Sequence, residues 1–194
     1  RRERRLHVAS LLAFAVGCMY LVAVVLAAPL QRAKDILSDS LFQEGTASQN
    51  VVVVAIGEEE LSKYGRISTW PRGRHATAID QLAEAGARVI AYDMLFADEG
   101  PDDDELAAAM GRAANVVLAA SGELRVSADA DAITVYNDVA LPAEPLFASA
   151  AVVASTSVET DGDGRVRRVP LEIADARGNV YPALSLAAFY LQFG

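Results

Sequence analysis

The sequence has one cysteine, two histidines and one tryptophan among its 194 residues, and these small numbers exclude several kinds of site. A single cysteine, Cys18, forms no intrachain disulfide and no cysteine-based metal site. The two histidines are too few for a three-histidine zinc site. His7 adjoins the uncharged segment and His75 begins a helical pattern, so neither is expected in a Ser–His–Asp arrangement. We therefore predict no metal site, and we expect His75 to lie on the surface of a helix.

The sequence also lacks glycine-rich phosphate-binding motifs, and most of it has few basic residues for its number of acids. Neither G-x-G-x-x-G nor G-K-S/T follows the first apolar run, so the sequence predicts no dinucleotide or other cofactor. Residues 36–194 hold eleven Lys and Arg against twenty-four Asp and Glu, a balance of −13. Proteins that bind nucleic acid need a positive surface, so we expect no nucleic-acid partner.

The N-terminal end has the opposite charge and a long apolar segment. Residues 1–35 carry a balance of +4, and residues 8–28 contain no charge. A helix of that length spans about 30 Å, the thickness of a bilayer's hydrocarbon core. Arginines precede it, which places the N-terminus in the cytoplasm. Residues 1–29 are thus predicted to be a basic tail and an uncleaved transmembrane helix, with the lipid bilayer as partner. The alternatives are a cleaved signal peptide, whose apolar region is usually shorter, and a buried core helix.

The predicted anchor leads into a globular part through a stalk. Residues 30–49 combine apolar side chains at helical spacing with a small polar stretch, which predicts a stalk helix and a linker. Residues 50–194 then form the globular domain, on the outer side of the cell inner membrane. The chain ends inside a helical pattern over residues 183–193, which suggests a domain truncated at its C-terminus.

The globular part opens with a strand–helix–strand pattern. Val51–Ile56 and Val89–Tyr92 are apolar runs, and residues 74–85 repeat apolar side chains at helical spacing until Gly86. Continuously apolar strands are typical of parallel sheets buried on both faces. A helix over residues 105–114 and a strand over 115–120 repeat the pattern. The predicted fold class is α/β: a parallel or mixed sheet layered with helices, preceded by one transmembrane helix.

The second half is less regular. Residues 121–132 are interpreted as a loop, residues 133–136 as a short strand, and residues 151–158 and 165–174 as an antiparallel pair. The turn between the last two imitates the first half of a calcium loop with Glu159, Asp161, Asp163 and Gly164. The glutamate that such a loop requires is replaced by Pro170, so a hairpin turn is predicted instead.

Several stretches, in order and spacing, resemble the second class of CHASE domains, extracytoplasmic sensor modules of bacterial signalling proteins. The stretches that match are Val51–Gly57 with the acids after it, Gly65 with Trp70-Pro71-Arg72, Leu82–Phe96, Asp161–Pro170 and Pro182–Ala187. The resemblance covers about residues 30–194. The chain departs from it where Gly57 or Glu58 replaces a usual aspartate, and in a shortened tryptophan loop.

The resemblance implies a function for the whole protein. It implies the sensor portion of a membrane receptor, acting as a homodimer and coupled to a cytoplasmic adenylate or guanylate cyclase or a protein kinase beyond Gly194. Such a sensor portion is not itself an enzyme, and its signal is an unknown small molecule or protein.

Five residues are candidates for ligand binding. Glu58 and Asp93 follow the two apolar runs, at the strand edge where α/β proteins bind ligands, and Trp70, Arg72 and Arg74 lie in or after the loop before the first long helix. In a purely structural interpretation, Asp93 caps a turn or pairs with Arg72 or Arg74. Residues 102–104 are interpreted as a solvated helix start.

Two other functions remain open from the sequence. A periplasm-facing hydrolase would use Asp93 and Glu58 as paired carboxylates with raised pKa values in one cleft. A membrane-anchored structural adaptor would have a partner surface and no pocket.

Overall fold

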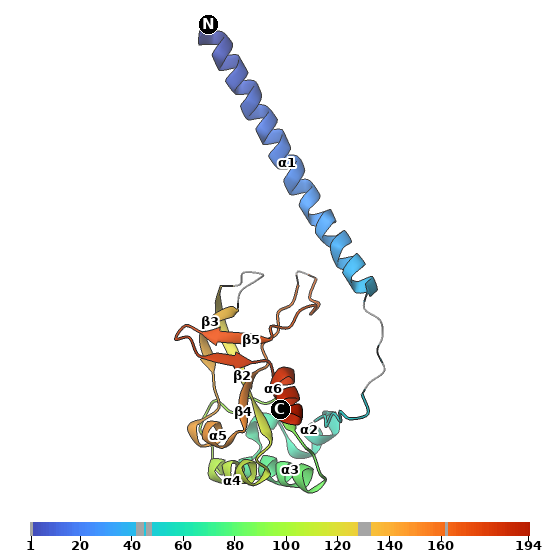
Figure 1. The fold of residues 1–194 in the computed structure, drawn as a ribbon, viewed down its shortest axis with the longest axis vertical. Helices are drawn as coiled ribbons and strands as arrows, with labels where there is room; N and C mark the ends of the chain where they lie inside the picture. The colour runs from blue at the N-terminus through green and yellow to red at the C-terminus, as the bar shows by residue number, and fades with distance from the viewer. Residues whose placement is uncertain (1, 42–44, 46–47, 128–132, 162) are drawn as a thin grey trace. The chain divides into compact units, whose positions relative to one another are not determined.

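The computed structural model describes residues 2–41, 45, 48–127, 133–161 and 163–194 (Figure 1). The chain divides into two compact units, Arg1–Ala55 and Ile56–Gly194.

The first unit consists mainly of one helix, α1 (Arg2–Leu41), with Pro29 inside it. Its forty residues correspond to about 60 Å at 1.5 Å per residue. The helix continues without interruption through the predicted tail, membrane segment and stalk. The transmembrane helix predicted within residues 1–29 is not found, because among the described residues no helix is both long and apolar enough for a membrane span.

The second unit is built on a six-stranded mixed sheet with the order β1-β2-β3-β5-β6, in which β4 also pairs with β2. The strands are β1 (Ile90–Tyr92), β2 (Val116–Ser127), β3 (Thr134–Ala140), β4 (Val152–Ser155), β5 (Glu172–Asp175) and β6 (Val180–Pro182). This confirms the predicted mixed α/β class of the globular part.

The long strand β2 belongs to two parts of the sheet. Its apolar first half, Val116–Ala120, lies between β1 and β4, and both pair with it in parallel. These five residues are at most 2% exposed, as expected for a strand covered on both faces. Its second half, Ser121–Ser127, alternates in polarity and pairs antiparallel with β3. The prediction of a loop over residues 121–132 is therefore wrong as far as Ser127. The backbone hydrogen bonds of this segment are made with the neighbouring strand β3.

Helices cover both faces of the parallel part (Figure 1). The helices of the second unit are α2 (Glu58–Tyr64), the 3-10 turn η1 (Ile67–Thr69), α3 (Arg72–Glu84), α4 (Asp103–Ala113), α5 (Glu144–Ser149) and α6 (Leu184–Phe193). Val116 and Leu118 pack with α3, α4 and α5, whereas Val117 packs with α6. Successive side chains of a strand point to opposite faces, so α6 lies on the face opposite the other three helices.

The predicted first strand, Val51–Ile56, is wrong. These residues are not in a strand, and Val51–Val54 are 68–83% exposed. A strand needs a neighbour that supplies hydrogen bonds, and among the described residues β1 pairs with β2 alone. The parallel strand–helix–strand unit is formed one step later, by β1, α4 and β2.

The predicted antiparallel pairing of residues 151–158 with 165–174 is also wrong. β4 lies parallel to β2, and β5 lies between β3 and β6. Among the described residues, one antiparallel bridge joins Arg168 to Glu159, which lies just after the first run.

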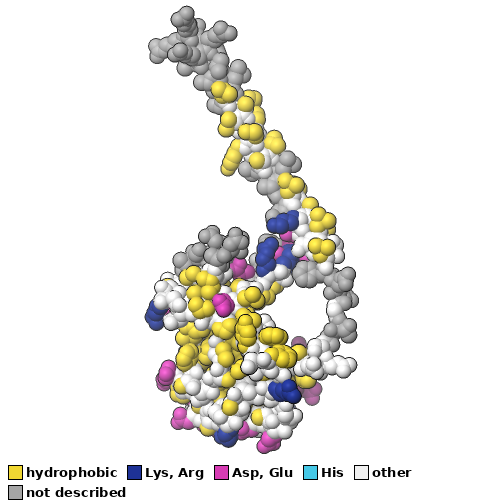
Figure 2. Space-filling view, viewed as in Figure 1, with side chains coloured by type: hydrophobic (Ala, Val, Ile, Leu, Met, Phe, Trp, Pro, Cys, Tyr) yellow, Lys and Arg dark blue, Asp and Glu magenta, His cyan; other side chains and the backbone are white. Residues whose placement is uncertain are grey.

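Apolar side chains also remain on the surface of the second unit (Figure 2). On α6 the exposed fractions are 56% for Phe189, 62% for Tyr190 and 72% for Phe193. The opposite side of α6 is buried through Ala187. This helix is therefore apolar on both sides.

Candidate functional site

Aromatic and basic side chains gather where the chain turns from α2 into α3. Gly65 ends α2 with φ of 80°, a conformation that side chains with a Cβ rarely adopt. Pro71 precedes α3, and Trp70 is extended as that proline predicts, with φ −73° and ψ 135°. Trp70 Nε1 donates to the Gly65 carbonyl oxygen at 3.1 Å and closes the loop. The ring centroids of Tyr64 and Trp70 then lie 5.8 Å apart.

Arg74 lies against both of these rings. Its guanidinium carbon is 4.1 Å from the Tyr64 ring centroid and 4.9 Å from that of Trp70. Contacts of a cation with aromatic faces stabilise the charge in place of water. Arg74 Nη1 is buried and has no hydrogen-bond partner among the described residues. The side chain thus carries a charge whose hydrogen-bonding capacity is incompletely used.

Arg72 has a different role, because it pairs with the start of α4. Arg72 Nε donates to Asp103 Oδ1 at 2.9 Å, and Arg72 Nη2 donates to the Asp98 carbonyl oxygen at 3.0 Å. The other oxygen of Asp103 accepts from the Gly100 amide at 2.8 Å. The guanidinium carbon lies 4.4 Å from the Phe96 ring centroid. Arg72 therefore joins α3 to the loop before α4.

This geometry corrects two expectations. Asp103 is 7% exposed and paired, so it is not part of a solvated helix start. Asp93 is exposed beyond β1, and Arg72 pairs with Asp103 rather than with it. The sequence alone does not indicate which of the aspartates at positions 102–104 is buried, because this depends on where Arg72 of α3 lies.

His75 lies next to Trp70, with 6.0 Å between the two ring centroids, and is 2% exposed. Its Nδ1 and the Tyr92 hydroxyl oxygen share a hydrogen bond of 2.8 Å, and its ring centroid lies 5.3 Å from that of Phe96. The predicted helix-surface position is wrong. Its spacing of four from the buried Ile79 was the signal that places it on the inner face of α3.

Burial also shifts the titration of this pair. Burial, followed by the nearby charges of Arg72 and Arg74, lowers the pKa of His75 below its ordinary value. Burial raises the pKa of Tyr92 to about 12. Both groups are therefore neutral at neutral pH.

The lowered pKa of His75 predicts a loss of stability on acidification. The unfolded chain takes up the His75 proton near its ordinary pKa of about 6.5, whereas the folded chain resists it. Stability is therefore complete above about pH 6.5 and falls below it, by at most roughly 1.4 kcal/mol per pH unit for one group. Urea unfolding between pH 7.5 and 5.0 measures this slope. His75→Phe is expected to flatten it, and an equal slope in the variant would contradict the assignment.

The remaining predicted residues lie outside these contacts. Glu58 is exposed at the first position of α2, and Asp93 is exposed after β1. The structure brings together Trp70 and Arg74, and it adds residues that the sequence did not indicate. These are Tyr64, His75, Tyr92, Phe96 and Asp103.

The acidic turn near residue 160 is neutralised within the chain. Arg167 pairs with Asp161 at 2.8 Å and with Asp163 at 2.7 Å. The hydrogen bond from Arg167 lowers the pKa of Asp163 to about 2. Gly164 has φ of 80°, which suits a turn. In the part of the chain that the structure describes, no cluster of His, Cys, Asp or Glu is arranged to hold a metal.

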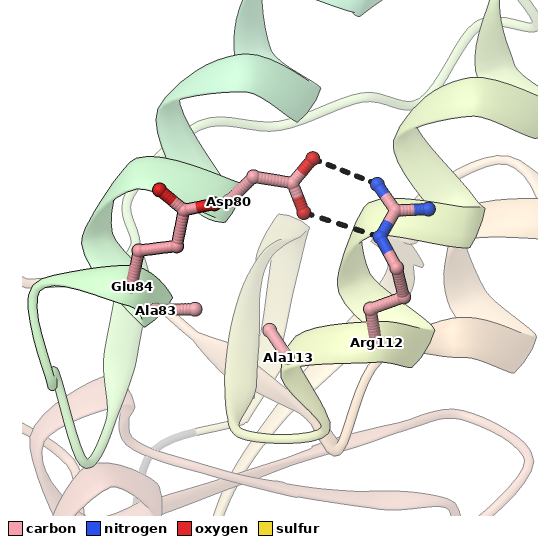
Figure 3. A pocket seen from close by; sticks show the side chains of 5 residues that line it. All are labelled: Asp80, Ala83, Glu84, Arg112 and Ala113. Carbon is pink, nitrogen blue, oxygen red and sulfur yellow. Dashed lines mark hydrogen bonds and ion pairs between the residues drawn. The ribbon is translucent and has the colours of Figure 1, made fainter.

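A hollow of about 410 Å³ between α3 and α4 is lined by the five residues in Figure 3. Two hydrogen bonds join Arg112 to Asp80 across it, at 3.3 Å and 2.7 Å. A second hollow, of about 490 Å³, is lined mainly by acids from Glu99 to Glu105. Asp80 and Arg112 neutralise each other in the first hollow, and Glu84 is the third charged side chain that lines it.

Comparison with known proteins gives one match. The model of the CHASE2 domain family matches residues 15–193. No curated protein and no solved structure matches the chain. The match covers almost the whole chain, and the chain therefore belongs to the CHASE2 family of extracellular sensor domains.

Proposed function

We propose that this chain is the extracytoplasmic sensor portion of a bacterial transmembrane receptor. The family match over residues 15–193 is the observation that carries the proposal. In the longer protein, the output is an adenylate or guanylate cyclase or a protein kinase in the cytoplasm, and the receptor works as a homodimer. A signal shifts such a receptor only by binding one of its states more tightly than the other.

The membrane anchor is part of the same proposal, and its support is the sequence. Residues 8–28 contain no charge, and arginines stand at positions 1, 2, 4 and 5 before them. This pattern favours an inner-membrane span whose N-terminus is cytoplasmic.

The proposed ligand site consists of Trp70, Arg72, Arg74, Glu58 and Asp93. Trp70 and Arg74 are supported by their mutual contact, and Arg72 is included because it begins α3 two residues before Arg74. Asp93 is included because it follows β1, and Glu58 because it is exposed at the first position of α2. The hydrolase alternative needs these two carboxylates in one cleft, whereas both are exposed and neither lines the two hollows described above.

Reporter fusions test the orientation that the proposal requires. Alkaline phosphatase fused after Gly194 is expected to be active, and green fluorescent protein at the same position is expected to be dark, because the former folds outside the cytoplasm and the latter inside it. The matched control is green fluorescent protein fused before Arg1, which should fluoresce. Fluorescence from the fusion after Gly194 would contradict the outward-facing sensor.

A further inference from the structure

Arg74 has a buried N–H group to which a ligand could supply a hydrogen-bond acceptor. The side chain lies against two aromatic rings, yet Nη1 is buried without a hydrogen-bond acceptor among the described residues. A buried donor without an acceptor is unfavourable, and a charged one more so. An oxygen that reached this nitrogen would relieve that cost. Arg72 on α3 and Arg112 on α4, by contrast, already have carboxylate partners.

The cover over Arg74 is weakly attached. Tyr64, whose ring lies on the guanidinium, is the last residue of the seven-residue helix α2, and α2 has no buried residue. Tyr64 itself is 43% exposed. Gly57 and Gly65 stand at the two ends of α2. A short helix between two glycines, with no buried side chain, can move away at low cost.

Two cations contact the ring of Tyr64, although α2 also carries Glu58, Glu59 and Glu60 in its first turn. Lys63 Nζ lies 4.9 Å from the Tyr64 ring centroid, so Lys63 and Arg74 both contact the same ring. A guanidinium offers paired N–H groups in one plane, which match the paired oxygens of a carboxylate or phosphate. The positive charge of Lys63 would add to the attraction.

We propose that Arg74 recognises a small ligand through a carboxylate or phosphate group, and that α2 is a cover which Tyr64 holds over it. This inference rests on the proposed sensor function and names the chemistry of its signal. When the anion binds, Tyr64 leaves the guanidinium and α2 moves. The N-terminal end of α2 continues directly into residues 51–57, so its displacement acts on the segment that leads to α1.

Trp70 provides the measurement, because it is the chain's one tryptophan and touches Arg74. The chain of residues 1–194 is titrated with inorganic phosphate and, separately, with acetate, at an ionic strength held constant with sodium chloride. We expect a saturable change in Trp70 emission with one or both probes. Arg74→Gln should raise the half-saturating concentration by about tenfold or more, as expected for loss of a charge-assisted hydrogen bond. The matched control Arg112→Gln should leave it unchanged.

A second variant tests the cover. Tyr64→Ala removes the ring that competes for Arg74, so half-saturation should occur at about a two- to fivefold lower concentration, the equivalent of one exposed cation–π contact. Circular dichroism verifies that each variant is folded. An equal response in wild type and Arg74→Gln, or no saturable response, would overturn the inference.

The Arg74→Gln variant also separates this inference from the proposed function. If Trp70 reports Arg74-dependent binding but Arg74→Gln leaves the output of the full-length receptor unchanged, the anion site stands and the sensor role fails. If the output responds to a signal while Trp70 emission is independent of Arg74, the sensor role stands and the anion site fails.

Discussion

Arg72→Ala is expected to lower the free energy of unfolding by about 2–4 kcal/mol, because it leaves the carboxylate of Asp103 buried without its cation. The side chains of the pair are 18% and 8% exposed, which keeps most water away from the charges. The substitution also removes the donor to the Asp98 carbonyl oxygen and the contact with Phe96. Urea unfolding followed by Trp70 fluorescence measures the loss.

A second ion pair of the same chemistry supplies the control. Arg112 and Asp80 also join α3 to α4, but their side chains are 58% and 39% exposed. Solvent-exposed pairs contribute about 1 kcal/mol or less, so Arg112→Ala should have a small effect. Equal losses for Arg72→Ala and Arg112→Ala would show that burial of the first pair does not matter.

Phe96→Ala is expected to cost about 3–5 kcal/mol of unfolding free energy, the range for removing a buried aromatic ring. Phe96 is 2% exposed, and its ring centroid lies 5.3 Å from that of His75 and 5.9 Å from that of Tyr92. The cavity left behind would also admit water beside His75. We therefore expect the pKa of His75 to rise towards its ordinary value, which proton NMR of the imidazole ring measures.

Two control variants show whether the loss in Phe96→Ala comes from the buried ring. Phe96→Leu keeps most of the side-chain volume and should cost clearly less than Phe96→Ala. Phe189→Ala removes a ring that is 56% exposed on α6, and it should change stability by about 0.5 kcal/mol or less. A loss at Phe96 no larger than that at Phe189 would contradict the described packing.

Local patterns predicted those elements whose ends and faces are marked in the sequence. The helix expected over residues 74–85 is α3, and Gly86 follows it with φ of 86°. The Gly86 amide donates to the Ala83 carbonyl oxygen, and the Ala87 amide donates to the Leu82 carbonyl oxygen, as in a Schellman motif. A glycine that needs a left-handed conformation is visible in the sequence, and so is a periodic apolar face.

Strand pairing was not predictable in the same way. Val51–Ile56 has the composition of a buried strand, but composition cannot supply a neighbour. Residues 121–127 look like a loop and form half of β2, because β3 lies beside them. Pairing depends on contacts between distant segments, which a local pattern does not contain.

The candidate site shows the same division. Trp70 and Arg74 could be predicted because tryptophan, proline and arginine stand close together in the sequence, just before and at the start of α3. Tyr64 and Asp103 could not, since each reaches the arginines from another helix. His75 was expected on the surface of a helix, but its position on the inner face of α3 buries it.

The four valines at positions 51–54 have a practical consequence for anyone who handles the chain. Val51–Ile56 combines high β propensity with no charge, no proline and no glycine, which is the composition of segments that stack into cross-β fibrils. With these side chains in water, this stretch is an aggregation-prone segment in concentrated solutions. A lysine substituted within it would act as a gatekeeper and keep such solutions clear.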